Sequence, residues 1–140
     1  MSWALSHIGI AVKNIDAAIK SYRIICPDLK VSDRVKVPDQ SLEVCFLDFP
    51  RHSGIGRIEL LADTGDIGNG GVIAKFLEKR GEGLHHTCFT CENIEEKLVE
   101  LERQGIELID KVPRIGALGK KIAFIHPEST HGALIELEEE

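Results

Sequence analysis

The chain has 140 residues, of which 43% are hydrophobic and 29% charged, values typical of a globular protein of one domain. Its net charge of -6 argues against a general nucleic-acid binder, because such a protein needs a basic surface. No apolar run approaches the roughly 18 residues that span a bilayer, and the N-terminus lacks the basic and apolar regions of a signal peptide. We therefore expect a soluble cytoplasmic protein that binds neither nucleic acid nor membranes.

The first half of the chain predicts one strand, one helix and three further strands. The first strand covers 7–12, and Asn14 is expected to cap a helix that continues to Ile25 with an apolar stripe on one side. The strands after this helix are expected at 30–36, 42–48 and 57–62.

The second half predicts the same order of elements. A glycine-rich loop and a helix at 72–80 precede a strand that begins near His86. Asn93 is expected to cap the next helix, with Glu96 three residues later as in a capping box, and Gly105 to end it. Strands follow at 106–110, 121–126 and 132–137. The sequence therefore predicts two consecutive modules, each with the element order β-α-β-β-β.

The two modules also share residues. His7–Ile19 aligns without a gap on His86–Leu98 at an offset of 79, and Arg57–Leu61 aligns on Leu134–Glu138 at an offset of 77. Modules of roughly 55 residues are too small to be comfortably stable alone, so we expect them to build one domain over residues 1–140. Within it, the first repeat covers 5–62, the linker 63–83 and the second repeat 84–138.

Two histidines and two glutamates occupy equivalent positions in the repeats: His7, Glu59, His86 and Glu136. Each histidine opens a strand face with small residues, and each glutamate stands between apolar residues, where an unpaired carboxylate would be costly. Imidazole and carboxylate groups together suit a divalent cation. For one residue alone, a structural histidine or a solvated glutamate is the simpler interpretation, but the duplicated set favours a metal site.

The four cysteines are expected to be reduced and at least partly buried. Cys88 and Cys91 have C-x-x-C spacing, but they lie on a predicted strand, where side chains three apart point to opposite faces. No second C-x-x-C occurs, so a zinc ribbon is excluded.

These features resemble the vicinal oxygen chelate superfamily, which includes glyoxalase I, ring-cleaving dioxygenases and bleomycin-resistance proteins. The segments Gly83–His86 and Phe124–Pro127 are most similar to its branch of methylmalonyl-CoA epimerases. The resemblance implies an α+β fold in which two βαβββ modules, in pseudo-twofold arrangement, form a curved, partly closed mixed sheet around a metal site. It also implies a homodimer.

The resemblance places metal ligands at His7, His86 and Glu136, with Glu59 in a fourth position where some members carry Gln. It implies Co²⁺ as the ion, with Zn²⁺, Ni²⁺ or Mn²⁺ as alternatives. The implied reaction interconverts (R)- and (S)-methylmalonyl-CoA by removing and returning the α-proton through a metal-stabilised enolate. Glu43 and Glu136 would be the acid/base pair. Contacts to the acyl-CoA are expected from a basic, glycine-rich loop: Arg114, Gly116 and Lys120.

Several alternatives remain open at this point. A glyoxalase I-type lyase would use the same metal ligands, a ring-cleaving dioxygenase would use two histidines and one glutamate around iron, and a drug-sequestering module would lack the metal site. The simpler interpretation of the loop after Pro113 is a plain hairpin turn. Asp39 is a second acidic residue close to Glu43 in the alignment with the family. His52, His126 and His131 are expected at surface or structural positions, and Trp3 is expected to anchor the N-terminal segment.

Overall fold

The structure is a computed structural model that describes residues 4–49 and 56–140, so Trp3 and His52 lie outside the described residues. The chain divides into two compact units. The first, Ile8–His85, is called the N-terminal unit here. The second, called the C-terminal unit, consists of the segment up to His7 together with His86–Glu140. This division falls inside the first and sixth strands rather than at the ends of the sequence repeats, and the single domain stays a prediction.

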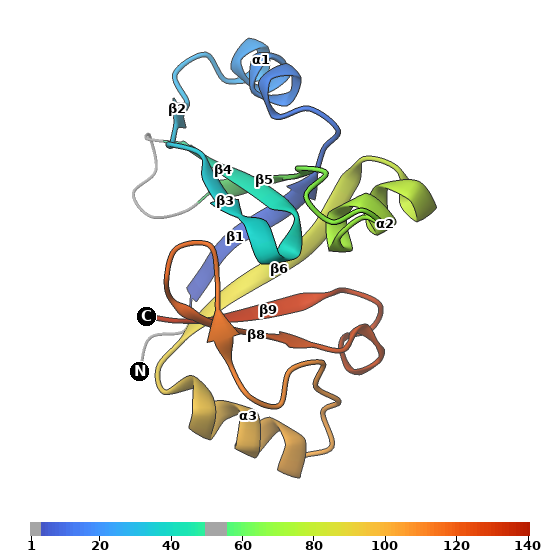
Figure 1. Cartoon of the computed structure of the whole chain (residues 1–140). Helices are drawn as coiled ribbons and strands as arrows, with labels where there is room; N and C mark the ends of the chain where they lie inside the picture. The colour runs from blue at the N-terminus through green and yellow to red at the C-terminus, as the bar shows by residue number, and fades with distance from the viewer. Residues whose placement is uncertain (1–3, 50–55) are drawn as a thin grey trace. The chain divides into compact units, whose positions relative to one another are not determined.

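The N-terminal unit contains a mixed sheet and two helices (Figure 1). Its strands follow the order β2-β4-β5-β1, with β3 also paired to β4; β1 is parallel to β5, and the other pairs are antiparallel. The strands are β1 (Ala4–Ala11), β2 (Lys30–Val31), β3 (Val35–Val37), β4 (Leu42–Asp48) and β5 (Arg57–Asp63). The helices are α1 (Ile15–Ile25) and α2 (Val72–Arg80), and the 3-10 turn η1 covers Pro38–Gln40.

Helix α1 begins and packs as its sequence predicts. The Asn14 side chain accepts a hydrogen bond from the Ala17 N–H at 2.9 Å, and Ile15 packs with Cys45, Leu47 and other residues of one sheet face. That face of β4 and β5 is therefore covered by α1. The expected strand 30–36 is wrong in part, because it divides into β2 and β3.

The C-terminal unit contains the second module (Figure 1). Its strands follow the order β6-β9-β8-β7, with β6 parallel to β9 and the other pairs antiparallel. The strands are β6 (Gly83–Cys91), β7 (Arg114–Ile115), β8 (Lys121–Ile125) and β9 (Ile135–Glu139). Helix α3 covers Ile94–Arg103, and the 3-10 turn η2 covers Pro127–Thr130. The α+β class and the two mixed-sheet modules are thus confirmed.

Helix α3 covers one face of this second sheet. Asn93 accepts a hydrogen bond from the Glu96 N–H at 3.3 Å, as the capping pattern predicts. The buried side of the helix packs with residues of β6, β8 and β9 that share one face; this core consists of Cys91, Ile94, Leu98, Ala123, Ile125 and Leu137. Because side chains alternate along a strand, the other face of the same strands remains available for a functional site.

Leu98→Ala is expected to lower the free energy of unfolding by about 2 to 5 kcal/mol, because it leaves a cavity in this core. Leu98 is 1% exposed, whereas its neighbour Val99 is 58% exposed. Val99→Ala is the matched control and should change the free energy of unfolding by less than about 0.5 kcal/mol. Denaturant titration of both variants measures the effect, and equal losses would contradict the assignment of Leu98 to the core.

The predicted strand at 106–110 is wrong. Only an isolated bridge between Leu108 and Ile125 forms there. Ile109 and Asp110 both donate their backbone N–H to the carbonyl of Phe124, so the segment does not continue a regular ladder. The third antiparallel strand is instead β7, which pairs with β8 through Arg114 and Ile122.

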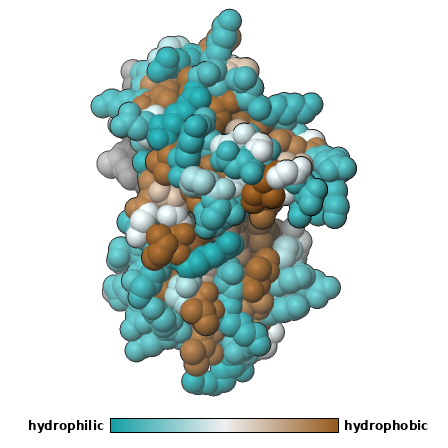
Figure 2. Space-filling view, in the orientation of Figure 1, coloured by the Kyte–Doolittle hydropathy of each residue, from teal (hydrophilic) through white to brown (hydrophobic). Residues whose placement is uncertain are grey.

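The cysteine prediction is confirmed: all four are free, and Cys45, Cys88 and Cys91 are fully buried. Cys88 pairs with Glu136 on the face away from α3, while Cys91 belongs to the α3 core. In the part of the chain that the structure describes, no helix is long and apolar enough to cross a membrane. Figure 2 shows apolar side chains in several groups separated by polar ones on the face that it draws.

Candidate metal centre

Three predicted ligand side chains meet in the C-terminal unit. The Glu136 Oε1 atom lies 3.4 Å from His7 Nε2 and 3.2 Å from His86 Nε2. The two Nε2 atoms are 3.3 Å apart, and their rings meet nearly at right angles. His7, His86 and Glu136 are 4%, 5% and 8% exposed. Two nitrogens and one carboxylate oxygen therefore face one another in a buried space.

Strand pairing explains how residues distant in sequence reach this position. Glu136 stands opposite Cys88 in the β6–β9 pairing, and Cys88 is two residues after His86 on β6. His86, Cys88 and Glu136 therefore share the face that α3 does not cover. The register of the β6–β9 pair, combined with the alternation of side chains along each strand, decides this placement.

The lone pairs of these atoms need a proton or a cation among them. Lone pairs of two neutral imidazoles and a carboxylate repel one another at 3.2–3.4 Å unless a proton or a cation lies between them. Glu136 Oε1 is buried and has no hydrogen-bond partner among the described residues. His7 Nδ1 lies 3.0 Å from Ser6 Oγ. With its proton on Nδ1, His7 donates to this hydroxyl and keeps the Nε2 lone pair for a cation.

These three groups fit a divalent metal ion. Ligand atoms at about 2.0–2.2 Å from an ion are about 3.0–3.5 Å from one another, and the measured separations fall in this range. Two imidazoles and a carboxylate are a donor set used by first-row transition metals and zinc. The C-terminal unit thus holds a buried group compatible with a divalent ion.

The charge state of Glu136 supports the same interpretation. Burial alone would raise the pKa of this carboxyl, but the two imidazoles that face it, His7 and His86, outweigh burial and lower the pKa to about 2. The carboxylate is therefore ionised at neutral pH and can act as an anionic ligand.

The lowered pKa predicts a pH dependence for the metal-free protein. The stabilising contribution of ionised Glu136 is fully present above its ordinary pKa of 4.5 and is lost as the pH falls toward about 2. The difference in unfolding free energy between the natural protein and Glu136→Gln should therefore shrink from pH 5 to pH 2. Denaturant titrations in a chelator measure this difference, and a constant difference would contradict the lowered pKa.

Glu59 belongs to the N-terminal unit. It is 7% exposed and stands opposite Gly9 in the β1–β5 pairing and opposite Phe46 in the β4–β5 pairing. Its side chain therefore lies on the face of β5 away from the α1 core, which contains Leu60 and Ala62.

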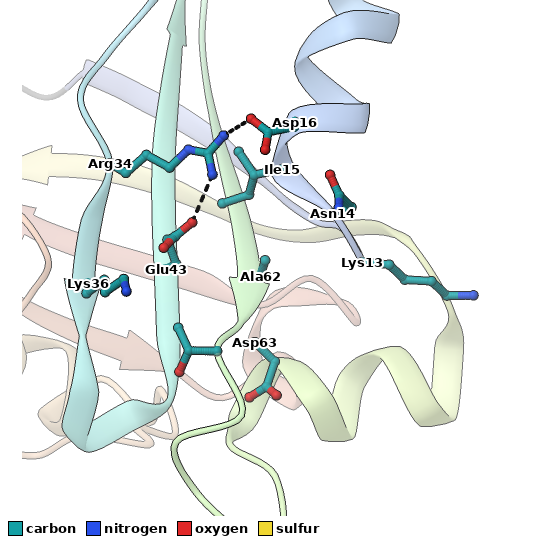
Figure 3. Close-up of a pocket in the computed structure, with 10 residues that line it drawn as sticks. Lys13, Asn14, Ile15, Asp16, Arg34, Lys36, Glu43, Ala62 and Asp63 are labelled. Atoms are coloured by element: carbon teal, nitrogen blue, oxygen red, sulfur yellow. Dashed lines mark hydrogen bonds and ion pairs between the residues drawn. The ribbon is translucent and has the colours of Figure 1, made fainter.

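Glu43 lies on the other face of the same strands. It pairs with Ala62, shares its face with Cys45 and Leu47, and accepts a hydrogen bond from Arg34 Nη1 at 3.2 Å. Figure 3 shows Arg34 between Glu43 and Asp16, with contacts to both. These groups line a polar pocket of about 250 Å³ within the N-terminal unit. The structure does not bring Glu43 to the same face as Glu59, and the catalytic role of Glu43 stays a prediction.

The loop predicted to contact substrate is a hairpin between β7 and β8. Arg114 lies on β7, and the Gly116 N–H donates to the Lys120 carbonyl at 2.8 Å. A Cβ at Gly116 would come within 2.9 Å of the Ile122 side chain, so close packing accounts for this glycine. The hairpin interpretation is confirmed, while the substrate contacts stay a prediction.

The structure adds a residue that the sequence reasoning missed. Phe124 stands opposite Glu136 in the β8–β9 pairing, and its ring meets that of His86 edge to face. The segment Phe124–Pro127 carried the family resemblance, but nothing local assigned the phenylalanine to the metal face. His85, by contrast, packs its ring on Phe76 of α2.

A second group of histidine and carboxylates occurs on the surface: Glu107, His126 and Glu128 each offer a donor atom within 4.8 Å of the others. His126 Nδ1 accepts the Glu128 N–H as the cap of η2. In the neutral ring the proton is then on Nε2, which leaves no lone pair for a metal. This confirms the structural role expected for His126.

Comparison with known proteins adds three findings. The sequence pattern of the Glyoxalase/Bleomycin resistance protein/Dioxygenase superfamily matches residues 6–124. The chain is 41% identical over 134 residues to the uncharacterized protein YqjC of Bacillus subtilis, covering 95% of this chain and 89% of that protein. It is 36% identical over 137 residues to the ethylmalonyl-CoA/methylmalonyl-CoA epimerase of Cereibacter sphaeroides, covering 96% of both.

Solved structures agree with these matches. A methylmalonyl-CoA epimerase in complex with methylmalonyl-CoA and NH4⁺ superposes with a TM-score of 0.84 at 30% identity, covering 96% of this chain and 92% of the other. The match extends over nearly the whole chain.

Proposed function

Because this chain belongs to the Glyoxalase/Bleomycin resistance protein/Dioxygenase superfamily, we propose that it is a metal-dependent epimerase of methylmalonyl-CoA. Relatives named as such epimerases at 30–36% identity support this substrate. The observation that carries the proposal is the convergence of His7, His86 and Glu136 around a buried carboxylate oxygen without a hydrogen-bond partner among the described residues.

His7, His86 and Glu136 would hold the ion, with Glu59 as the fourth ligand. When bound, a divalent ion such as Co²⁺, Zn²⁺, Ni²⁺ or Mn²⁺ would supply Lewis acidity to the carbonyl and carboxylate oxygens of the substrate. The burial of His7, His86 and Glu136 would help to exclude water that competes for these oxygens.

The acid/base work would fall to two carboxylates. Epimerisation moves a proton from C2 to a base on one face of the acyl group and returns a proton to C2 from the opposite face. We propose Glu136 and Glu43 for these roles, exchanged between the two directions of the reaction. Arg114 and Lys120 would contribute positive charge toward the anionic acyl-CoA, and the backbone of Gly116 would shape the hairpin between them.

Solvent deuterium uptake at C2 of methylmalonyl-CoA tests the proposal. Protein loaded with Co²⁺ should exchange the C2 proton, and a chelator should abolish exchange. Absence of exchange by metal-loaded protein would overturn the epimerase assignment. Parallel assays with a glutathione hemithioacetal and with a catechol would then identify a lyase or a ring-cleaving dioxygenase.

A further inference from the structure

A sequence of contacts connects the ligand group to strand β7. The ring centroids of His86 and Phe124 are 6.0 Å apart. The guanidinium carbon of Arg114 lies 5.4 Å from the centroid of the same Phe124 ring. Arg114 pairs with Ile122, which is two residues before Phe124 on β8, so Arg114 shares the face of Phe124 and Glu136. The Phe124 ring therefore lies in contact with both the positively charged Arg114 and His86, one of the proposed metal ligands.

Asp110 holds this arginine in place. Its Oδ2 atom accepts the Phe124 N–H at 2.9 Å and lies 3.5 Å from Arg114 Nε. The Asp110 side chain is only 18% exposed, while that of Arg114 is 42% exposed. Among the described residues, no hydrogen bond or ion pair engages the two terminal nitrogens of Arg114. Its Nε and its flat face thus contact Asp110 and Phe124, and its terminal N–H groups can bind a ligand.

We propose that Arg114 binds the acyl carboxylate of a dicarboxylic acyl-CoA, and that Asp110 is the positioning residue for it. The inference rests on the proposed function and assigns the specificity of the same site. A planar guanidinium matches a carboxylate with two parallel hydrogen bonds. The phosphates of coenzyme A offer similar anionic oxygens, but the pantetheine arm separates them from the acyl group by much more than one aromatic ring. The position of Arg114 next to Phe124 and His86 therefore favours the carboxylate.

Binding of malonyl-CoA and propionyl-CoA tests Arg114, because the two ligands differ by the acyl carboxylate. Calorimetry would use Co²⁺-loaded natural protein and the variant Arg114→Gln. The variant should bind malonyl-CoA about tenfold more weakly or worse, as expected for the loss of a charge-assisted hydrogen bond, and propionyl-CoA with less than about a twofold change. Arg103→Gln is the matched control, since Arg103 is exposed on α3, which covers the opposite face of the sheet, and should change neither affinity.

Asp110 is tested by two variants. Asp110→Asn keeps an acceptor for the Phe124 N–H but removes the charge beside Arg114, so KM for methylmalonyl-CoA should rise with little change in kcat or in unfolding free energy. Asp110→Ala removes both and should also lower stability. A merely structural role would lower stability and leave the ratio of malonyl-CoA to propionyl-CoA affinity unchanged, which would overturn the positioning role.

The outcomes separate the inference from the proposed function. Equal weakening of both ligands by Arg114→Gln would assign this residue to the phosphates and overturn the carboxylate assignment, as would unchanged affinities. Natural protein that binds neither acyl-CoA would overturn the proposed function itself. Selective loss of malonyl-CoA affinity alone supports the inference.

Discussion

Glu136→Gln is expected to weaken metal binding by at least about 100-fold, because replacing groups that only support a ligand already costs about 10- to 100-fold. The amide oxygen is neutral and cannot offset the charge of the ion. Deuterium exchange at C2 should fall further, by about 10²- to 10⁴-fold at saturating metal, if the carboxylate also moves the proton. Metal titration and exchange kinetics on the same samples separate the two losses.

The surface group of Glu107, His126 and Glu128 supplies the control for this result. Glu128→Gln makes the same chemical change in an exposed carboxylate and should leave metal content and exchange unchanged. Loss of the metal from Glu128→Gln but not from Glu136→Gln would place the ion at the surface group and contradict the buried centre.

Glu43→Gln is expected to slow deuterium exchange at C2 of methylmalonyl-CoA by about 10²-fold or more, because it removes one of the two proposed acid/base groups. The metal content of the protein should stay constant. This variant tests the role of Glu43 separately from that of Glu59. Glu43 lies with Arg34 on the sheet face that α1 covers, whereas Glu59 lies on the opposite face of the sheet. Exchange kinetics together with metal analysis measure the two expected effects.

A purely structural role for Glu43 gives a different pattern. Loss of the Arg34 ion pair alone would lower the free energy of unfolding by no more than about 1 kcal/mol, since Arg34 is partly exposed, and would leave exchange unchanged. That outcome would reassign the second acid/base role. Asp39→Asn is the control, because Asp39 is exposed on η1 and is the neighbouring acid in the alignment with the family.

Local patterns predicted most of the fold because they depend on short-range physics. The caps at Asn14 and Asn93 form as expected, since a side-chain oxygen three residues before a backbone N–H satisfies it in any helix start. The strands at 42–48 and 57–62 also form, and alternation along them shows which side chains share a face. The segment 106–110 fails because strand formation there needs a partner in regular register, and Phe124 accepts two successive N–H groups instead.

The sequence by itself determined that two histidines and two glutamates occur in equivalent places, because a duplicated module preserves spacing. It also determined that His86, rather than His85, matches His7. Only the tertiary structure decided that Glu136 reaches both imidazoles, that Phe124 and Arg114 adjoin His86, and that Glu43 lies on the face covered by α1. Spacing along a chain does not specify strand register, since register depends on the partner strands and on the core that each face buries.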